Sequence, residues 1–141
     1  MTESSAGDSR EIDTKYMMEV GKILRAAAEA VAEGWTELGL LVNQAPNIQG
    51  VTTYAVVTWN GQQYDKWMPD EALADLADVL AKWQFSLTQA GHPNWTAMFV
   101  GAKSSGGFVW LPDYTPDYGP WRIRGDISNW PTVEQGLKYV S

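Results

Sequence analysis

The sequence predicts an α+β protein: an antiparallel sheet of about five to six strands packed against two main helices, with a short C-terminal helix, in a single domain. Apolar residues recur at helical spacing in two long segments, and short alternating segments meet at turn residues elsewhere. Because the predicted strands occur in groups joined by hairpin turns, and the helices lie outside those groups, the sheet is expected to be antiparallel.

The first helix carries one apolar stripe at helical spacing. Asp13 or Thr14 can cap its start, and Gly34 suits a left-handed residue just after its end. The residues before it are small and polar. Residues 1–12 are therefore predicted to form a disordered tail, and residues 13–141 the domain.

Three antiparallel strands are predicted between the two helices. The first, residues 35–42, alternates weakly, whereas residues 51–59 are rich in β-branched and aromatic side chains and form the clearest strand. Asn60 and Gly61 both tolerate positive φ, so they favour a tight hairpin turn that leads into a return strand at residues 62–67.

The second helix is predicted to begin at a cap formed by Asp70, after Pro69, and to end near Gly91 and Pro93. Its apolar residues are spaced three and four apart and form one seam: Leu73, Leu76, Leu80, Trp83 and Leu87. Its other face is acidic and is interpreted as a solvated surface: Glu71, Asp75 and Asp78.

The C-terminal part begins with a second hairpin. Two alternating segments, 95–103 and 108–111, flank a turn at residues 104–107 that contains two glycines. The Pro-, Asp- and Tyr-rich residues 113–120 are predicted to form a loop, followed by a short strand at residues 121–125.

A short helix is expected to follow from Pro131 to about Val140. It would dock on the sheet through Leu137 and Val140, although Gly136 is expected to weaken it.

The composition excludes several classes of function. The 141 residues carry a formal net charge of -7, no cysteine and one histidine, His92. An acidic chain lacks the basic face that nucleic-acid binding requires, and a tetrahedral zinc site needs more than one His or Cys ligand. We expect no metal, no cofactor and no membrane span, and we interpret the protein as cytoplasmic. An acidic surface does fit a basic protein partner.

The late loops hold an acidic and aromatic group of residues that we predict to bind a protein partner: Asp113, Tyr114, Asp117, Tyr118, Trp121 and Asp126. A second interpretation stays open, in which the aromatic rings pack inward and the aspartates form Asx turns. A third is a carbohydrate hydrolase, with Asp113 and Asp117 as the carboxylate pair and Trp110 and Trp121 as sugar platforms.

The order of several short motifs resembles that of the YezG-like antitoxin and immunity proteins, which neutralise secreted toxins, often nucleases, of bacterial type VII secretion systems. The resemblance covers roughly residues 13–141. The similar pieces are Gly34-Trp35, Asp75 to Leu80, Trp95-Thr96, Ser104 to Phe108, Asp113-Tyr114, and a closing segment with Trp130 and Tyr139. The early strands depart from the family, since they are rich in Thr, Val and Trp instead of charged residues.

The resemblance implies binding without turnover. It leads us to expect an immunity protein that occludes the active site of a cognate, basic toxin domain. No catalytic residue is carried over from the family. The alternatives are a secretion chaperone or adaptor that binds an effector without inhibiting it, and the carbohydrate hydrolase. The oligomeric state and the identity of the toxin are left open.

Overall fold

The structure is a computed structural model that describes residues 9–31, 34–44, 52–59, 63–65, 68–123 and 130–140. For residues 52–59 and 63–65 it describes the backbone alone. The hairpin turn predicted at Asn60-Gly61 and the predicted site residue Asp126 lie outside the described residues.

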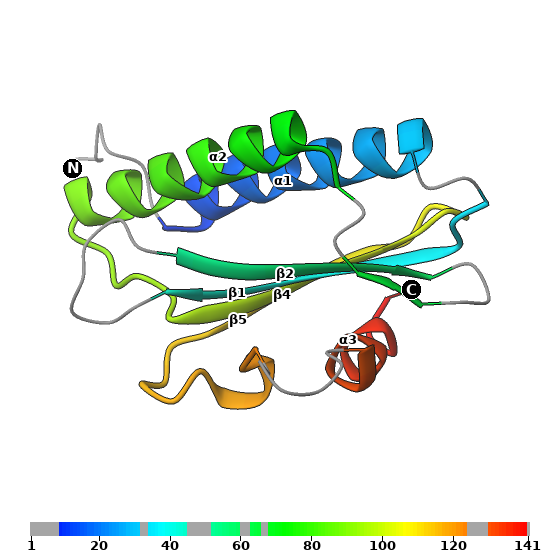
Figure 1. Cartoon of the computed structure of the whole chain (residues 1–141). Coiled ribbons are helices and arrows are strands. Elements are labelled where there is room, and N and C mark those ends of the chain that lie inside the picture. The colour runs from blue at the N-terminus through cyan, green and yellow to red at the C-terminus, as the bar shows by residue number, and fades with distance from the viewer. Residues whose placement is uncertain are drawn as a thin grey trace.

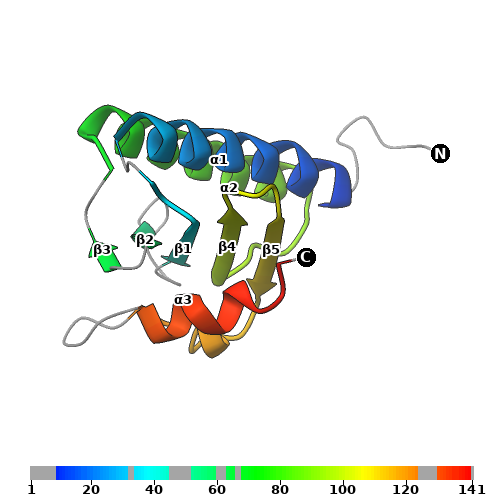
Figure 2. The ribbon, with the colours of Figure 1, turned by 90° about the vertical axis from the view of Figure 1, so that its right-hand side faces the viewer.

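The described elements form three layers (Figures 1 and 2). Two long helices, α1 (Ser9–Val31) and α2 (Asp70–Gln89), cover one face of the sheet. A short helix, α3 (Trp130–Leu137), and a 3-10 turn, η1 (Gly119–Trp121), lie against the opposite face. The α+β class with three helices in the described part of the chain is confirmed.

The described strands form one antiparallel sheet in the order β3-β2-β1-β4-β5. The strands are β1 (Glu37–Gln44), β2 (Thr52–Trp59), β3 (Gln63–Asp65), β4 (Ala97–Lys103) and β5 (Phe108–Asp113). The two hairpin groups of the sequence meet at β1 and β4, which pair from Glu37 with Lys103 to Asn43 with Ala97. Strands β1 and β4 lie at the centre of the described sheet, and nearly all of their residues are buried.

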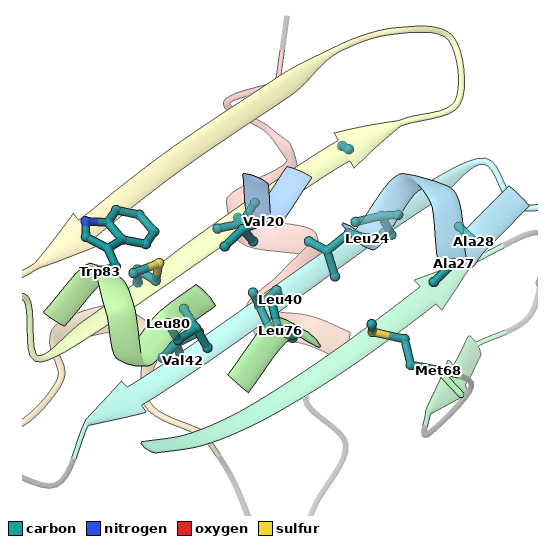
Figure 3. Packing of buried hydrophobic residues seen from close by; sticks show 14 of the residues in the cluster. Val20, Leu24, Ala27, Ala28, Leu40, Val42, Met68, Leu76, Leu80 and Trp83 are labelled. Carbon is teal, nitrogen blue, oxygen red and sulfur yellow. The ribbon is translucent and has the colours of Figure 1, made fainter. Parts of the chain in front are cut away.

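The upper core lies between the helices and the sheet (Figure 3). Leu38, Leu40 and Val42 of β1 point into it, as their spacing predicts, while Leu41 points to the opposite face. The seam predicted for α2 is also confirmed. Its residues Leu76, Leu80, Trp83 and Leu87 are at most 1% exposed, and Leu73 is partly buried against the same cluster.

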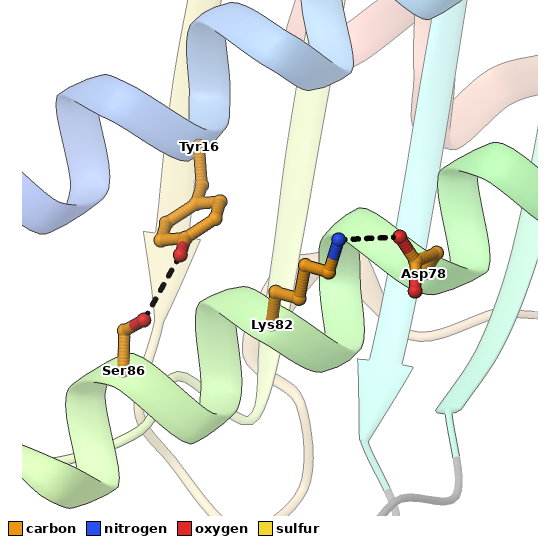
Figure 4. Close-up of polar contacts among 4 residues, drawn as sticks. All are labelled: Tyr16, Asp78, Lys82 and Ser86. Carbon is orange, nitrogen blue, oxygen red and sulfur yellow. Dashed lines mark hydrogen bonds and ion pairs between the residues drawn. The ribbon is translucent and has the colours of Figure 1, made fainter.

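Polar contacts tie α1 to α2 above this core (Figure 4). The hydroxyls of Tyr16 and Ser86 lie 3.0 Å apart, and the Tyr16 ring stacks on Trp83 at 6.3 Å. On the exposed face of α2, Lys82 Nζ lies 2.9 Å from Asp78 Oδ2. That ion pair is well exposed and contributes little to stability.

The lower core is organised around Phe99 of β4, which is fully buried. Its ring stacks on Trp121 of η1 with centroids 5.2 Å apart. Glycines occupy the positions where its ring approaches the backbone, both on β4 itself and on α3. A methyl group at Gly101 would lie 2.6 Å from Phe99 Cε2, and one at Gly136 of α3 would lie 2.5 Å from the same atom. Gly136, which the sequence suggests as a weak point of the helix, is what lets α3 pack closely against the sheet.

Gly136→Ala is expected to lower the free energy of unfolding by about 1–3 kcal/mol, because the new methyl group overpacks a buried ring. Gly21→Ala in α1 is the matched control. Its methyl group would lie 2.8 Å from Phe108 Cε1, but Phe108 is 36% exposed and can turn away. The control should therefore be neutral or gain up to about 1 kcal/mol from helix propensity. Urea unfolding measures both changes, and equal effects would contradict the role given to Gly136.

Both long helices begin at a different residue from the one that the sequence predicted. The first helix already begins at Ser9, so Asp13 and Thr14 lie inside it and neither is its cap. At the start of α2 the capping residue is Pro69, with ψ 154° and no side-chain cap bond, and Asp70 is the first helical residue. Gly34 and Gly91 have φ of 74° and 76°, as predicted for residues that follow helix ends.

The β4–β5 hairpin is confirmed, with its turn at residues 104–107. Lys103 N donates to Gly107 O at 3.0 Å, and Gly106 takes a φ of 124° in the turn. On β5, Pro112 lies opposite Met98. Because inward and outward amides alternate along an antiparallel ladder, the nitrogen of Pro112 falls at an outward-pointing position and no ladder bond is lost.

Within the described ranges, no helix combines the length and the apolar character needed to cross a membrane.

Candidate functional site

The candidate site is the segment of residues 113–119, which begins at the last residue of β5 and which we call the carboxylate loop. It holds four exposed or half-exposed side chains of the predicted site: Asp113, Tyr114, Asp117 and Tyr118. Thr96, just before β4, fixes its base. Thr96 N donates to Asp113 O at 2.9 Å, and Thr96 Oγ1 donates to Thr115 O at 2.6 Å. The loop is thereby attached to the end of the sheet.

Thr115 brings the two aspartates of the loop together. Its backbone N–H donates to Asp113 Oδ1 at 2.8 Å, which closes an Asx turn. Its hydroxyl lies within hydrogen-bond reach of Asp113 Oδ1 and is 3.0 Å from Asp117 Oδ1. Because a hydroxyl carries one proton, it donates to one carboxylate at a time. Both carboxylates are therefore held close to the same atom, and their remaining lone pairs are available to other donors.

Asp117 is held in its charged form. The Gly119 N–H donates to Asp117 Oδ1 at 3.1 Å, and this bond, followed by that from Thr115, lowers the pKa of the Asp117 carboxyl. Gly119 has a φ of 55°, and a methyl group on it would collide with the Asp113 carboxyl. Glycine is therefore needed here for both its backbone conformation and the approach of Asp113.

The two tyrosines of the loop differ in exposure. Tyr114 is 51% exposed, and its pKa is raised by partial burial and by the negative charge of Asp13. It therefore stays neutral, and about half of its side chain is open to solvent. Tyr118 is partly buried against the lower core and has a φ of 71°, the left-handed region that a tyrosine rarely adopts. Of the described non-glycine residues, it alone has a positive φ.

The structure places Trp121 elsewhere than predicted. It is 5% exposed, stacked on Phe99, and belongs to η1, so it is neither a surface residue nor part of a strand. Asn43 of β1 holds this segment in place: its Nδ2 donates to Trp121 O at 2.9 Å, and its Oδ1 accepts from Ile123 N at 2.9 Å. The prediction that Trp121 contacts a partner is therefore wrong, because the ring fills the lower core.

The two aspartates and two tryptophans considered for a carbohydrate hydrolase do not have the arrangement that a sugar-binding cleft would need. Trp110 packs toward the helices, with its indole N–H 3.3 Å from Met98 Sδ, whereas Trp121 lies on the opposite face of the sheet. The two rings therefore do not flank one ligand. Asp113 and Asp117 share a single hydroxyl instead of facing each other across a gap.

A polar cluster that sequence reasoning missed lies beside the loop, around Asp13. This aspartate of α1 is only 9% exposed, and its Oδ1 accepts a hydrogen bond of 2.8 Å from Trp83 Nε1 of α2. Trp83 also contacts Trp95 edge-on at 5.5 Å and Trp110 at 5.4 Å. Burial raises the pKa of Asp13, while the Trp83 bond and the charge of His92 oppose that rise.

Asp13→Asn is expected to remove a pH dependence of stability. Because the pKa of Asp13 in the folded state lies above its ordinary value of 3.8, the folded protein holds this proton more tightly than the unfolded chain. The contribution of protonated Asp13 to stability is therefore fully present below its ordinary pKa, and it is lost as the pH rises through the pKa of the folded state. Asparagine keeps an acceptor for Trp83 but does not titrate.

The measurement is urea unfolding of both proteins at about pH 3 and about pH 7. The stability of the natural protein, relative to that of Asp13→Asn, should be lower at the higher pH than at the lower pH. A constant difference would show that Asp13 has the same pKa in both states.

The remaining titratable groups offer no metal site in the described ranges, where no three His, Cys, Asp or Glu side chains gather as ligands. His92 follows the end of α2, where its backbone N–H donates to Leu87 O at 2.9 Å, and it is half-buried.

No protein-family model matches the chain, and no curated protein matches it in sequence.

Proposed function

We propose that the chain is an immunity protein, an antitoxin that binds a cognate toxin domain and neutralises it. The observation that supports this most is the carboxylate loop, in which Asp113 and Asp117 are held close to the same hydroxyl and which also carries the exposed Tyr114. A binding surface whose carboxylates are already ordered loses little conformational entropy when a basic partner pairs with them.

The charge of the whole chain supports the same proposal. A formal net charge of -7 attracts a basic partner and speeds the encounter. A toxin that cleaves nucleic acid needs a basic active-site cleft. An ordered pair of carboxylates can take the place of the phosphate groups in such a cleft, so the loop would act by occluding it.

The order of motifs that resembles the YezG-like immunity proteins points to the same class of partner, a secreted toxin associated with type VII secretion. In that setting the protein works in the cytoplasm, where it protects the cell that makes the toxin. The carboxylate loop needs no catalytic step for this role, since binding alone blocks the toxin.

The proposal is tested by recovering the partner with tagged full-length protein from its native cells and identifying it by mass spectrometry. We expect one stoichiometric partner with a basic domain. Expression of that domain alone in a test strain should stop growth, and co-expression of this chain should restore it. Complex formation should weaken as ionic strength rises.

The outcomes separate the alternatives. If the partner binds but is not toxic, or if its toxicity is not relieved, the chain is a secretion chaperone or adaptor and not an immunity protein. If no partner is recovered from cells that express the neighbouring genes, the binding proposal is overturned, and a ligand screen for an enzyme becomes the next step.

A further inference from the structure

We draw no further inference here: the strongest candidate, the outer face of α2, where Phe85 is 62% exposed on the same face as the acidic residues Glu71, Asp75 and Asp78, carries nothing because nothing in the structure shows what covers it.

Discussion

Phe99→Ala is expected to lower the free energy of unfolding by about 3–5 kcal/mol, the range for removing a fully buried phenylalanine. The ring is in contact with β1, η1 and α3 through Gly39, Trp121 and Gly136, so its loss leaves a cavity that no single neighbour can fill. Typical domains are stable by about 5–15 kcal/mol, and the variant would therefore lose a large part of the total. Urea unfolding monitored by tryptophan fluorescence measures it.

Phe108→Ala is the matched control for this prediction. Phe108 is also a phenylalanine of the β4–β5 hairpin but is 36% exposed, so its removal should cost less than about 1.5 kcal/mol. If the two variants were equally stable, the lower core would not be the rigid layer that the packing of Phe99 indicates. A variant too unstable to purify would agree with the prediction, provided that Phe99→Leu, which keeps most of the volume, folds.

The double variant Asp113→Asn/Asp117→Asn is expected to weaken binding to the toxin domain about 10–100-fold, because each substitution replaces a charged hydrogen bond, which contributes about 1.5–3 kcal/mol, by a neutral one, which contributes about 0.5–1.5 kcal/mol. Asparagine still accepts the bonds from Thr115 and Gly119, so the loop keeps its conformation and loses only its charge. Titration calorimetry with the purified partner measures the change, and unfolding curves should remain close to those of the natural protein.

Three further variants test whether the loop itself makes the contact. Glu71→Gln/Asp75→Asn makes the same charge change on the exposed face of α2 and should alter affinity by less than about threefold. Gly119→Ala keeps both charges but disturbs the loop, and should weaken binding. Gly106→Ala also strains the backbone, at the far turn of the hairpin, where a methyl group meets open space. It should leave binding unchanged. Equal losses in the two charge variants would mean that only the net charge matters.

Local sequence patterns predicted the two long helices and the β4–β5 hairpin, but not where the helices begin. The seam of α2 follows from its spacing, and Gly91 stands two residues after the last residue of α2 with a φ of 76°, which few residues other than glycine accept. The start of α1 was predicted wrongly for a physical reason. Aspartate is a residue type that often caps helices, but the carboxylate of Asp13 accepts a hydrogen bond from Trp83, which lies 70 residues away in sequence. No local pattern reports such a contact.

The site was predictable only in part. The Asx-turn interpretation describes Asp113 and Asp117, because these bonds run within two residues and are visible in the Asp-x-Thr-x-Asp spacing. The same loop contains Tyr114, whose exposure agrees with the binding interpretation. Trp121 was misplaced because its burial depends on Phe99 and on Asn43, which are distant in sequence. Thr96 and Gly119 order the loop, but no local sequence pattern identifies them as residues with that role.

The outward-facing proline on β5 has a consequence for the behaviour of the protein in a crowded cell. An unpaired edge strand is a template on which another chain can add by backbone hydrogen bonds. At Pro112 the edge offers no donor, so an incoming strand loses its register there after pairing with only a short segment. The hairpin can thus remain open on its outer side without seeding fibrils, and the adjoining carboxylate loop is left clear for a specific partner.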